Sequence, residues 1–229
     1  MKRVVCFISI LFVLVFALFA APSFSVRASY LFSYDTNVYS EPMVKYGGAT
    51  WLEDRVKNPY VKRLNNGINS DMTIFFSESS NTGFSLGFSN GWAFRDKLYI
   101  PEPDDGSTTN WDYWSYKEYD NPSSKMRMFF SLGPTFRAMF GPLDLGIILR
   151  ASLGSYDLFK EYIIAGIQAE LYMNYYIANG FFITGGVFYD AHLMKFYLHN
   201  ESKWYEENYT MMSVGPYIGF GYTFGKRGK

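Results

Sequence analysis

Large apolar residues alternate with small or polar residues through most of this chain, and this period of two is the pattern of a β-strand. The segment 214–224, VGPYIGFGYTF, shows it clearly, because every second residue from Val214 to Phe224 is large or apolar. Residues two apart point to the same face of a strand, so one face of this segment is apolar. Eight segments carry the alternation, at about 28–39, 70–78, 83–94, 124–140, 143–155, 161–178, 181–198 and 210–224.

The connections between these segments alternate between short and long. The short ones have turn sequences, which are SSNTG after the second segment, GP at 141–142 and NG at 179–180. Transmembrane β-barrels of outer membranes have short periplasmic turns and longer outer loops. We therefore expect long extracellular loops at 40–69 and 95–123. An even number of strands leaves both ends of the barrel on the periplasmic side.

The two faces of the segments favour a membrane over water. In the segment 161–178, the row from Ile163 to Ile177 is apolar, and such a row is long enough for a strand of about 9–11 residues to cross a bilayer. A soluble barrel or sandwich is the alternative, but its wet face should be rich in Lys, Glu and Thr, whereas Gly and Ser dominate here. The predicted fold class is an all-β, eight-stranded antiparallel up-and-down transmembrane β-barrel.

The first 28 residues read as a secretory signal peptide. Lys2 and Arg3 precede an uncharged, mostly apolar run over 4–21, and small residues suited to cleavage follow. We expect cleavage after Ala28, with Ser25 as the second choice, which leaves 29–229 as the outer-membrane barrel. A retained membrane anchor is the alternative. The single cysteine lies inside the leader, so the mature chain is expected to have no disulfide.

The last strand resembles the terminal strand of outer-membrane barrel proteins, through the spacing Tyr217-x-Gly219-x-x-Tyr222-x-Phe224. The whole architecture is similar to that of the small eight-stranded bacterial barrels of the OmpA, OmpX and OmpW kind. This resemblance implies a location in the bacterial outer membrane, contact with its lipid, and recognition of the last strand by the barrel-assembly machinery. The chain departs from many of these proteins in its tail, because GKRGK follows Phe224.

Charged residues of both signs fall on the polar face of the strands, which would line the lumen. Charges in a narrow, poorly hydrated interior must be paired, so we predict a salt-bridge network that plugs the lumen. We expect Arg137 and Glu170 to meet over Gly146, with Arg150 or Arg127 as partner if the register slips by two residues. The predicted network contains Lys125, Arg127, Arg137, Arg150, Asp35, Asp71, Asp144, Glu170, Asp190 and His192.

The predicted second outer loop contains a group of aromatic residues that is a candidate ligand patch. Aromatic side chains dominate binding hot spots, and an aromatic rim at the membrane surface is the plainer interpretation. The patch consists of Trp111, Tyr113, Trp114 and Tyr116.

Three functions remain open for such a barrel. The first is a non-enzymatic outer-membrane protein that is structural or that contacts an extracellular ligand, and the second is a narrow channel or transporter for small or hydrophobic solutes. The third is a lipid-modifying enzyme using Asp190, His192 and Ser213, although an Asp and a His two residues apart on a strand lie roughly 7 Å apart. We expect no enzyme activity and no cofactor. Balanced charge, with 21 basic and 21 acidic residues, gives no basic patch for nucleic acid.

Overall fold

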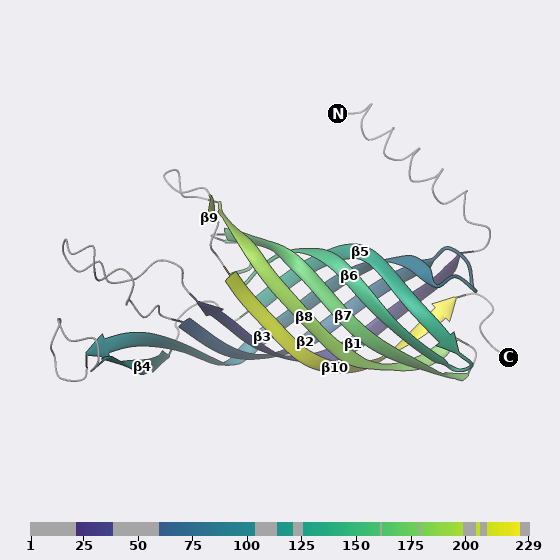
Figure 1. The fold of residues 1–229 in the computed structure, drawn as a ribbon, viewed down its shortest axis with the longest axis horizontal. Coiled ribbons are helices and arrows are strands. Elements are labelled where there is room, and N and C mark those ends of the chain that lie inside the picture. The colour runs from purple at the N-terminus through teal and green to yellow at the C-terminus, as the bar shows by residue number, and fades with distance from the viewer. Residues whose placement is uncertain are drawn as a thin grey trace, which may run out of the picture.

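The computed structural model describes residues 22–38, 60–103, 114–120, 126–160, 162–178, 180–198, 205–206 and 210–224. Eight long strands form the wall of a barrel (Figure 1), and they are β1 (Ser23–Val38), β2 (Tyr60–Phe75), β3 (Thr82–Pro103), β5 (Met126–Phe140), β6 (Leu143–Ser155), β7 (Tyr162–Ala178), β8 (Phe181–Tyr197) and β10 (Thr210–Phe224). Two short strands, β4 (Trp114–Asp120) and β9 (Tyr205–Glu206), pair with β3 and β8. No helix in the described part of the chain is long and apolar enough to cross a membrane.

The sheet is closed, because β10 pairs with β8 on one side and with β1 on the other. All neighbouring barrel strands are antiparallel. Following the paired positions around the barrel from Phe182 on β8 leads back to β8 at His192, ten residues away, which is a shear number of ten. Eight strands with this stagger are strongly tilted, and the interior is narrow enough for side chains to fill. The predicted fold class is confirmed.

The short turns and both ends of the barrel wall lie together. Gly141 and Gly180 have φ of 59° and 86° in the turns between β5 and β6 and between β7 and β8. This left-handed backbone is the reason for glycine at both turns. Figure 1 shows β4 and β9 at the opposite end. The long connections and the strand extensions therefore share one end, as the loop lengths predict.

Strands β2 and β3 are longer than the sequence predicts. Residues 60–69 and 95–103, expected to be parts of the long loops, belong to β2 and β3, and 114–120 forms β4. In this part of β2 the outward-facing row includes Lys62 and Asn66 in place of large apolar residues. The apolar signal disappears because these ends of the strands extend beyond the apolar part of the wall, although their backbones stay paired.

The outward-facing rows form an apolar belt around the barrel. In β10, the exposed residues include Val214, Ile218, Phe220 and Phe224, and the alternate residues are mostly buried. Aromatic side chains pack side by side near the short-turn end, where Phe24 contacts Phe224 with ring centroids 5.4 Å apart. An apolar belt with aromatic girdles is the outer surface of a barrel that lies in a bilayer. The apolar face of the last strand points outward, as predicted.

Pro216 lies on this outer face without a bulge. The pairs Leu31–Tyr217 and Tyr34–Val214 between β1 and β10 keep the same register, and the pairing is interrupted between them. Proline has no N–H to donate to a ladder. No bulge forms between β1 and β10 at Pro216, because the missing hydrogen bond interrupts the ladder without shifting it.

The belt predicts a depth-dependent cost for a charge. Ile147 lies midway along the outward row of β6, and Ile177 lies at the short-turn end of β7. We expect Ile147→Arg to destabilise the folded barrel by about 2–4 kcal/mol, and Ile177→Arg by about 0–1 kcal/mol, because arginine near an interface reaches water. The measurement is urea unfolding of the protein refolded in lipid vesicles. Equal losses at the two positions would contradict the assignment of the membrane face.

Candidate functional site in the barrel lumen

Four charged side chains form a closed ring in the middle of the lumen. The Arg27 guanidinium lies 2.6 Å from an Asp71 oxygen and 2.5 Å from a Glu170 oxygen. Arg150 lies 2.6 Å from the other Asp71 oxygen and 3.4 Å from the other Glu170 oxygen. Each carboxylate thus contacts both guanidiniums, and the four formal charges cancel. All four side chains are almost fully buried, so this neutral ring satisfies charges that water cannot reach.

Neutral polar groups extend the ring across the barrel. The Tyr217 hydroxyl accepts a hydrogen bond from Arg27 at 3.0 Å and donates to Glu170 at 2.6 Å. Arg150 also donates to Gln168 and to Ser85, at 3.0 and 2.6 Å. The members come from β1, β2, β3, β6, β7 and β10, so the network joins opposite sides of the wall.

Glycine at position 87 leaves the space that the ring needs. Gly87 lies between Asp71 on β2 and Ser131 on β5 in the ladder. A Cβ atom at Gly87 would lie 2.8 Å from an Arg150 nitrogen and 2.9 Å from an Asp71 oxygen. Arg150 therefore reaches Asp71 across the face of β3 only because residue 87 has no side chain.

A second cluster of charges lies nearer the outer end. Arg127 is 3.1 Å from Asp190 and 3.6 Å from Asp35. Asp35 also accepts hydrogen bonds from Asn65 and Ser213, at 2.6 and 2.5 Å. These groups are almost entirely buried, and one guanidinium thus holds two carboxylates.

His192 packs as an aromatic ring and does not form a catalytic set. Its ring stacks on Phe129 with centroids 4.5 Å apart, and neither ring nitrogen has a hydrogen-bond partner. Asp190 contacts Arg127, and Ser213 donates to Asp35. The hydrogen bonds that a Ser-His-Asp set requires are therefore not formed between these three residues.

The predicted pair of Arg137 and Glu170 is wrong. Arg137 is paired with Gly146 in register, as expected, but Tyr172 lies opposite Gly146 from the other side, and Glu170 lies opposite Ile148. Arg137 instead lies 3.7 Å from Asp144, near the short turns. Glu170 has Arg150 as a partner, which is one of the two alternatives that a slip of two residues predicts. Its other partner, Arg27, was not predicted.

Arg27 and the pair of Arg63 and Asp96 were missed by sequence reasoning. Arg27 was assigned to the leader, although the alternation of β1 begins at Ser23. Arg63 donates to Asp96 at 2.8 Å at the outer end of the lumen, and both residues were assigned to loops. Tyr34 and Ile74 belong to outward rows, and counting back from them in steps of two gives the other outward positions of β1 and β2. Arg27 and Arg63 lie between these positions, which would have placed both on the inward face.

Other predicted residues lie outside the described part of the chain or on the barrel surface. Lys125, Trp111 and Tyr113 are among the residues that the structure does not describe. Trp114 is the first residue of β4, and Tyr116 packs edge-on against Tyr60 with ring centroids 4.9 Å apart. No group of histidine, cysteine, aspartate and glutamate within the described segments could hold a metal ion.

The residues of the terminal signature take part in closing the barrel. Tyr217 points into the lumen toward the ring, and Gly219 pairs with Ser29 on β1. Tyr222 and Phe224 lie on the outer face near the short-turn end, with ring centroids 4.9 Å apart. The last strand thus joins the lumen network to the aromatic girdle.

Little free space remains inside the barrel. Two cavities of about 10 and 20 Å³ lie in the lumen, on either side of the central ring. A water molecule needs at least about 10–15 Å³, so each has room for about one. The buried side chains of Leu31, Ile148, Tyr172, Phe188 and Tyr217 fill much of the middle.

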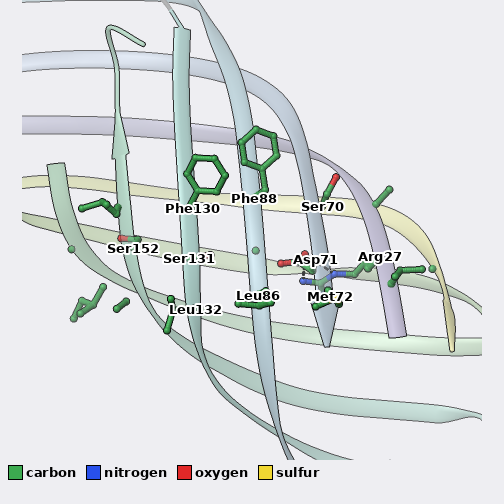
Figure 2. A pocket seen from close by; sticks show the side chains of 18 of the residues that line it. Arg27, Ser70, Asp71, Met72, Leu86, Phe88, Phe130, Ser131, Leu132 and Ser152 are labelled. Carbon is green, nitrogen blue, oxygen red and sulfur yellow. Dashed lines mark hydrogen bonds and ion pairs between the residues drawn. The ribbon is translucent and has the colours of Figure 1, made fainter. Parts of the chain in front are cut away.

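A groove of about 1190 Å³ lies on the outer face. Figure 2 shows Phe88 and Phe130 on one side of it and Leu86 and Leu132 on the other. Leu86, Phe130 and Leu132 are exposed members of the apolar belt and Phe88 is half-buried, whereas the ion pair of Arg27 and Asp71 lies behind the strands. The groove therefore opens toward lipid and is separate from the lumen.

Comparisons with solved structures find small outer-membrane barrels at low similarity. Neisserial surface protein A is 11% identical, with 88% of this chain and 97% of that chain covered and a TM-score of 0.48. OprG from Pseudomonas aeruginosa is 13% identical over 89% and 96%, with a TM-score of 0.42. Ail of Yersinia pestis, in complex with the heparin analogue sucrose octasulfate, is 14% identical over 88% and 99%, with a TM-score of 0.37. No protein-family model and no curated protein matches the chain.

The ring predicts strong coupling between its members. Glu170→Gln leaves two guanidiniums facing one carboxylate, and we expect it to lower the free energy of unfolding by about 3–5 kcal/mol. Adding Arg150→Met restores a neutral pair of Arg27 and Asp71, so the double variant should lose less than the sum of the single losses. The measurement is a double-mutant cycle by urea unfolding of the refolded barrel.

The matched control for this cycle combines Glu170→Gln with Arg137→Met. Arg137 pairs with Asp144 near the short turns, away from the ring, so its loss should add to that of Glu170 within about 0.5 kcal/mol. Additive losses for Arg150 and Glu170, or strong coupling of Arg137 to Glu170, would overturn the ring.

The position of Arg27 also bears on the cleavage of the leader. Residues Phe24–Ala28 pair with both β2 and β10, and Ser23 pairs with β2, so cleavage after Ala28 would remove this part of β1 together with Arg27. We expect cleavage before or directly after Ser23, which keeps Arg27 in the ring. Mass spectrometry of the N-terminal peptide from the exported protein tests this. A mature chain that starts at Ser29 would lack Arg27 and would contradict its place in the ring.

Proposed function

We propose that this chain is an integral outer-membrane protein with a closed lumen, which acts as a structural or surface-interacting protein through its outer end. The observation that supports the closed lumen most strongly is its filling, with paired charges at successive levels and cavities of about 10 and 20 Å³. An outer-membrane location is supported by the leader-like start and by the apolar belt. It is also supported by the first and last strands of the wall, which begin and end on the same side of the barrel.

A channel is the alternative function, and the interior gives it little support. A hydrated solute needs a continuous path, whereas Arg27, Arg150 and Tyr217 join opposite walls at the middle of the lumen. Opening a path there would separate buried charges, which is costly. A lipid-modifying enzyme is also less favoured, because His192 has no hydrogen bond to Ser213 or Asp190.

The outer end offers a surface for an extracellular ligand. Strands β2, β3 and β4 continue the sheet beyond the belt, and there Tyr60 stacks on Tyr99 with centroids 4.7 Å apart. Tyr116 packs against the same Tyr60. We infer that this aromatic group, together with Trp111, Tyr113 and Trp114 of the predicted patch, is the region through which a ligand would be bound.

Conductance in planar bilayers tests the closed lumen. The wild-type protein, shown to be folded by a difference in gel migration between boiled and unboiled samples, should give no discrete single-channel conductance. The variant that combines Arg150→Ala with Arg27→Ala removes both guanidiniums from the ring and serves as a comparison. Stable wild-type conductance from folded protein would favour the channel.

A further inference from the structure

Charge is distributed unevenly over the outward-facing surface. In the described strands, the outward rows of β1, β5, β6, β7, β8 and β10 contain no charged residue. Outward charges occur at the outer ends of β2 and β3, where Lys62, Arg95 and Lys97 lie, and on β4 beside them. One sector of the barrel therefore presents a basic group at the edge of the apolar belt.

Two of these lysines are held directly opposite each other. Lys62 and Lys97 are paired positions on β2 and β3, and Arg95 lies opposite Leu64 one step nearer the belt. Like charges directly opposite on the same face of a sheet destabilise it. The arrangement therefore favours anions close to these three side chains.

The anions provided by β4 lie next to Lys97. Its ammonium group lies 3.0 Å from Glu118 and 2.9 Å from Asp120. Hydrogen bonds from Tyr99 and Lys97 lower the pKa of Glu118, which keeps it ionised. Lys62 lies instead over the rings of Tyr60 and Tyr99, at 5.3 and 5.0 Å from their centroids. Two carboxylates thus face three cations, and both carboxylates form their ion pairs with Lys97.

The basic group lies at the level of lipid headgroups. Lys62 is twelve residues along β2 from Ile74 at the short-turn end. With about 3.3 Å per residue and a tilt of roughly 35–45°, this corresponds to about 28–32 Å along the membrane normal. Trp92 and Phe94 are exposed on β3 just below it. Cationic groups thus lie directly above large apolar side chains, and an amphipathic lipid presents the same two chemistries in the same order.

We propose that Lys62 and Arg95 bind the phosphate headgroup of an anionic lipid in the outer leaflet, and that Trp92 and Phe94 contact its acyl chain. This inference rests on the proposed location in the outer membrane. An arginine binds phosphate oxygens through two N–H groups, and a lysine adds a point charge. The long stems of both side chains lie along the apolar edge while their charged ends reach the headgroup layer.

Lipid retention tests the proposal with a defined probe. The refolded protein in detergent is mixed with phosphatidylcholine and phosphatidic acid, and native mass spectrometry measures the affinity for each lipid. A basic residue near an anionic membrane surface contributes about fivefold in affinity. We expect Lys62→Gln and Arg95→Gln each to weaken phosphatidic acid binding by about fivefold, with phosphatidylcholine binding unchanged.

Lys160→Gln is the matched control, because it removes the same charge from an exposed residue in the connection between β6 and β7. Its phosphatidic acid binding should equal that of the wild type. Equal losses in all three variants would overturn the site in favour of a general charge effect. Displacement of phosphatidic acid by an equal concentration of inorganic phosphate would assign the site to a soluble anion and overturn the lipid proposal.

Insertion is measured separately, in phosphatidylcholine vesicles without anionic lipid. Heat-modifiable migration of the inserted protein supports the barrel and its membrane location. Normal insertion together with equal binding of both lipids would overturn the headgroup site alone. Failure of the wild-type protein to insert would overturn the proposed function, and with it this inference.

Discussion

The pairing of buried charges inside the barrel is the constraint on which the rest of this structure depends. An eight-stranded wall with a shear number of ten encloses little space, and its outer face lies against lipid. Arg27, Asp71, Arg150 and Glu170 therefore satisfy one another in a neutral ring. Because these residues come from β1, β2, β6 and β7, the ring also determines which sides of the wall approach each other. Its loss would leave charges that neither water nor lipid can stabilise.

The ring also explains the small residues of the inward rows. An arginine side chain can cross the lumen only where the facing strand carries a small residue, and Gly87 provides this space for Arg150. Near the short turns, a Cβ atom at Gly146 would lie 2.3 Å from the ring of Tyr172. The glycine and serine content that distinguished this polar face from a wet surface is thus a consequence of large side chains meeting across a narrow interior.

The sequence was sufficient to predict the number of barrel strands, their faces and the end at which the chain turns tightly, because each depends on a period of two and on turn residues. Register was harder to predict. Gly146 pairs with Tyr172, so the connection between β6 and β7 is centred on residue 159, whereas the predicted pair with Glu170 places the centre at 158. A shift of one residue in a turn moves the register by two, and this exchanged Arg137 for Arg150 as the partner of Glu170. Leu158 and Phe159 both have φ of 61°, a left-handed backbone that residue preferences do not predict.

The strand ends beyond the belt were missed for a related reason. Once a strand leaves the membrane, its outward row no longer has to be apolar, and Lys62 then resembles a loop residue. The same change gives the outer end its chemical character. Inside the barrel each arginine lies within 4 Å of a carboxylate in the described network, so the lumen has few groups left for a ligand. At the outer edge, Lys62 and Lys97 face each other beside exposed aromatic residues. Groups that can bind a partner are therefore concentrated outside the wall, where strand pairing continues but neither lipid nor a filled lumen limits the choice of side chain.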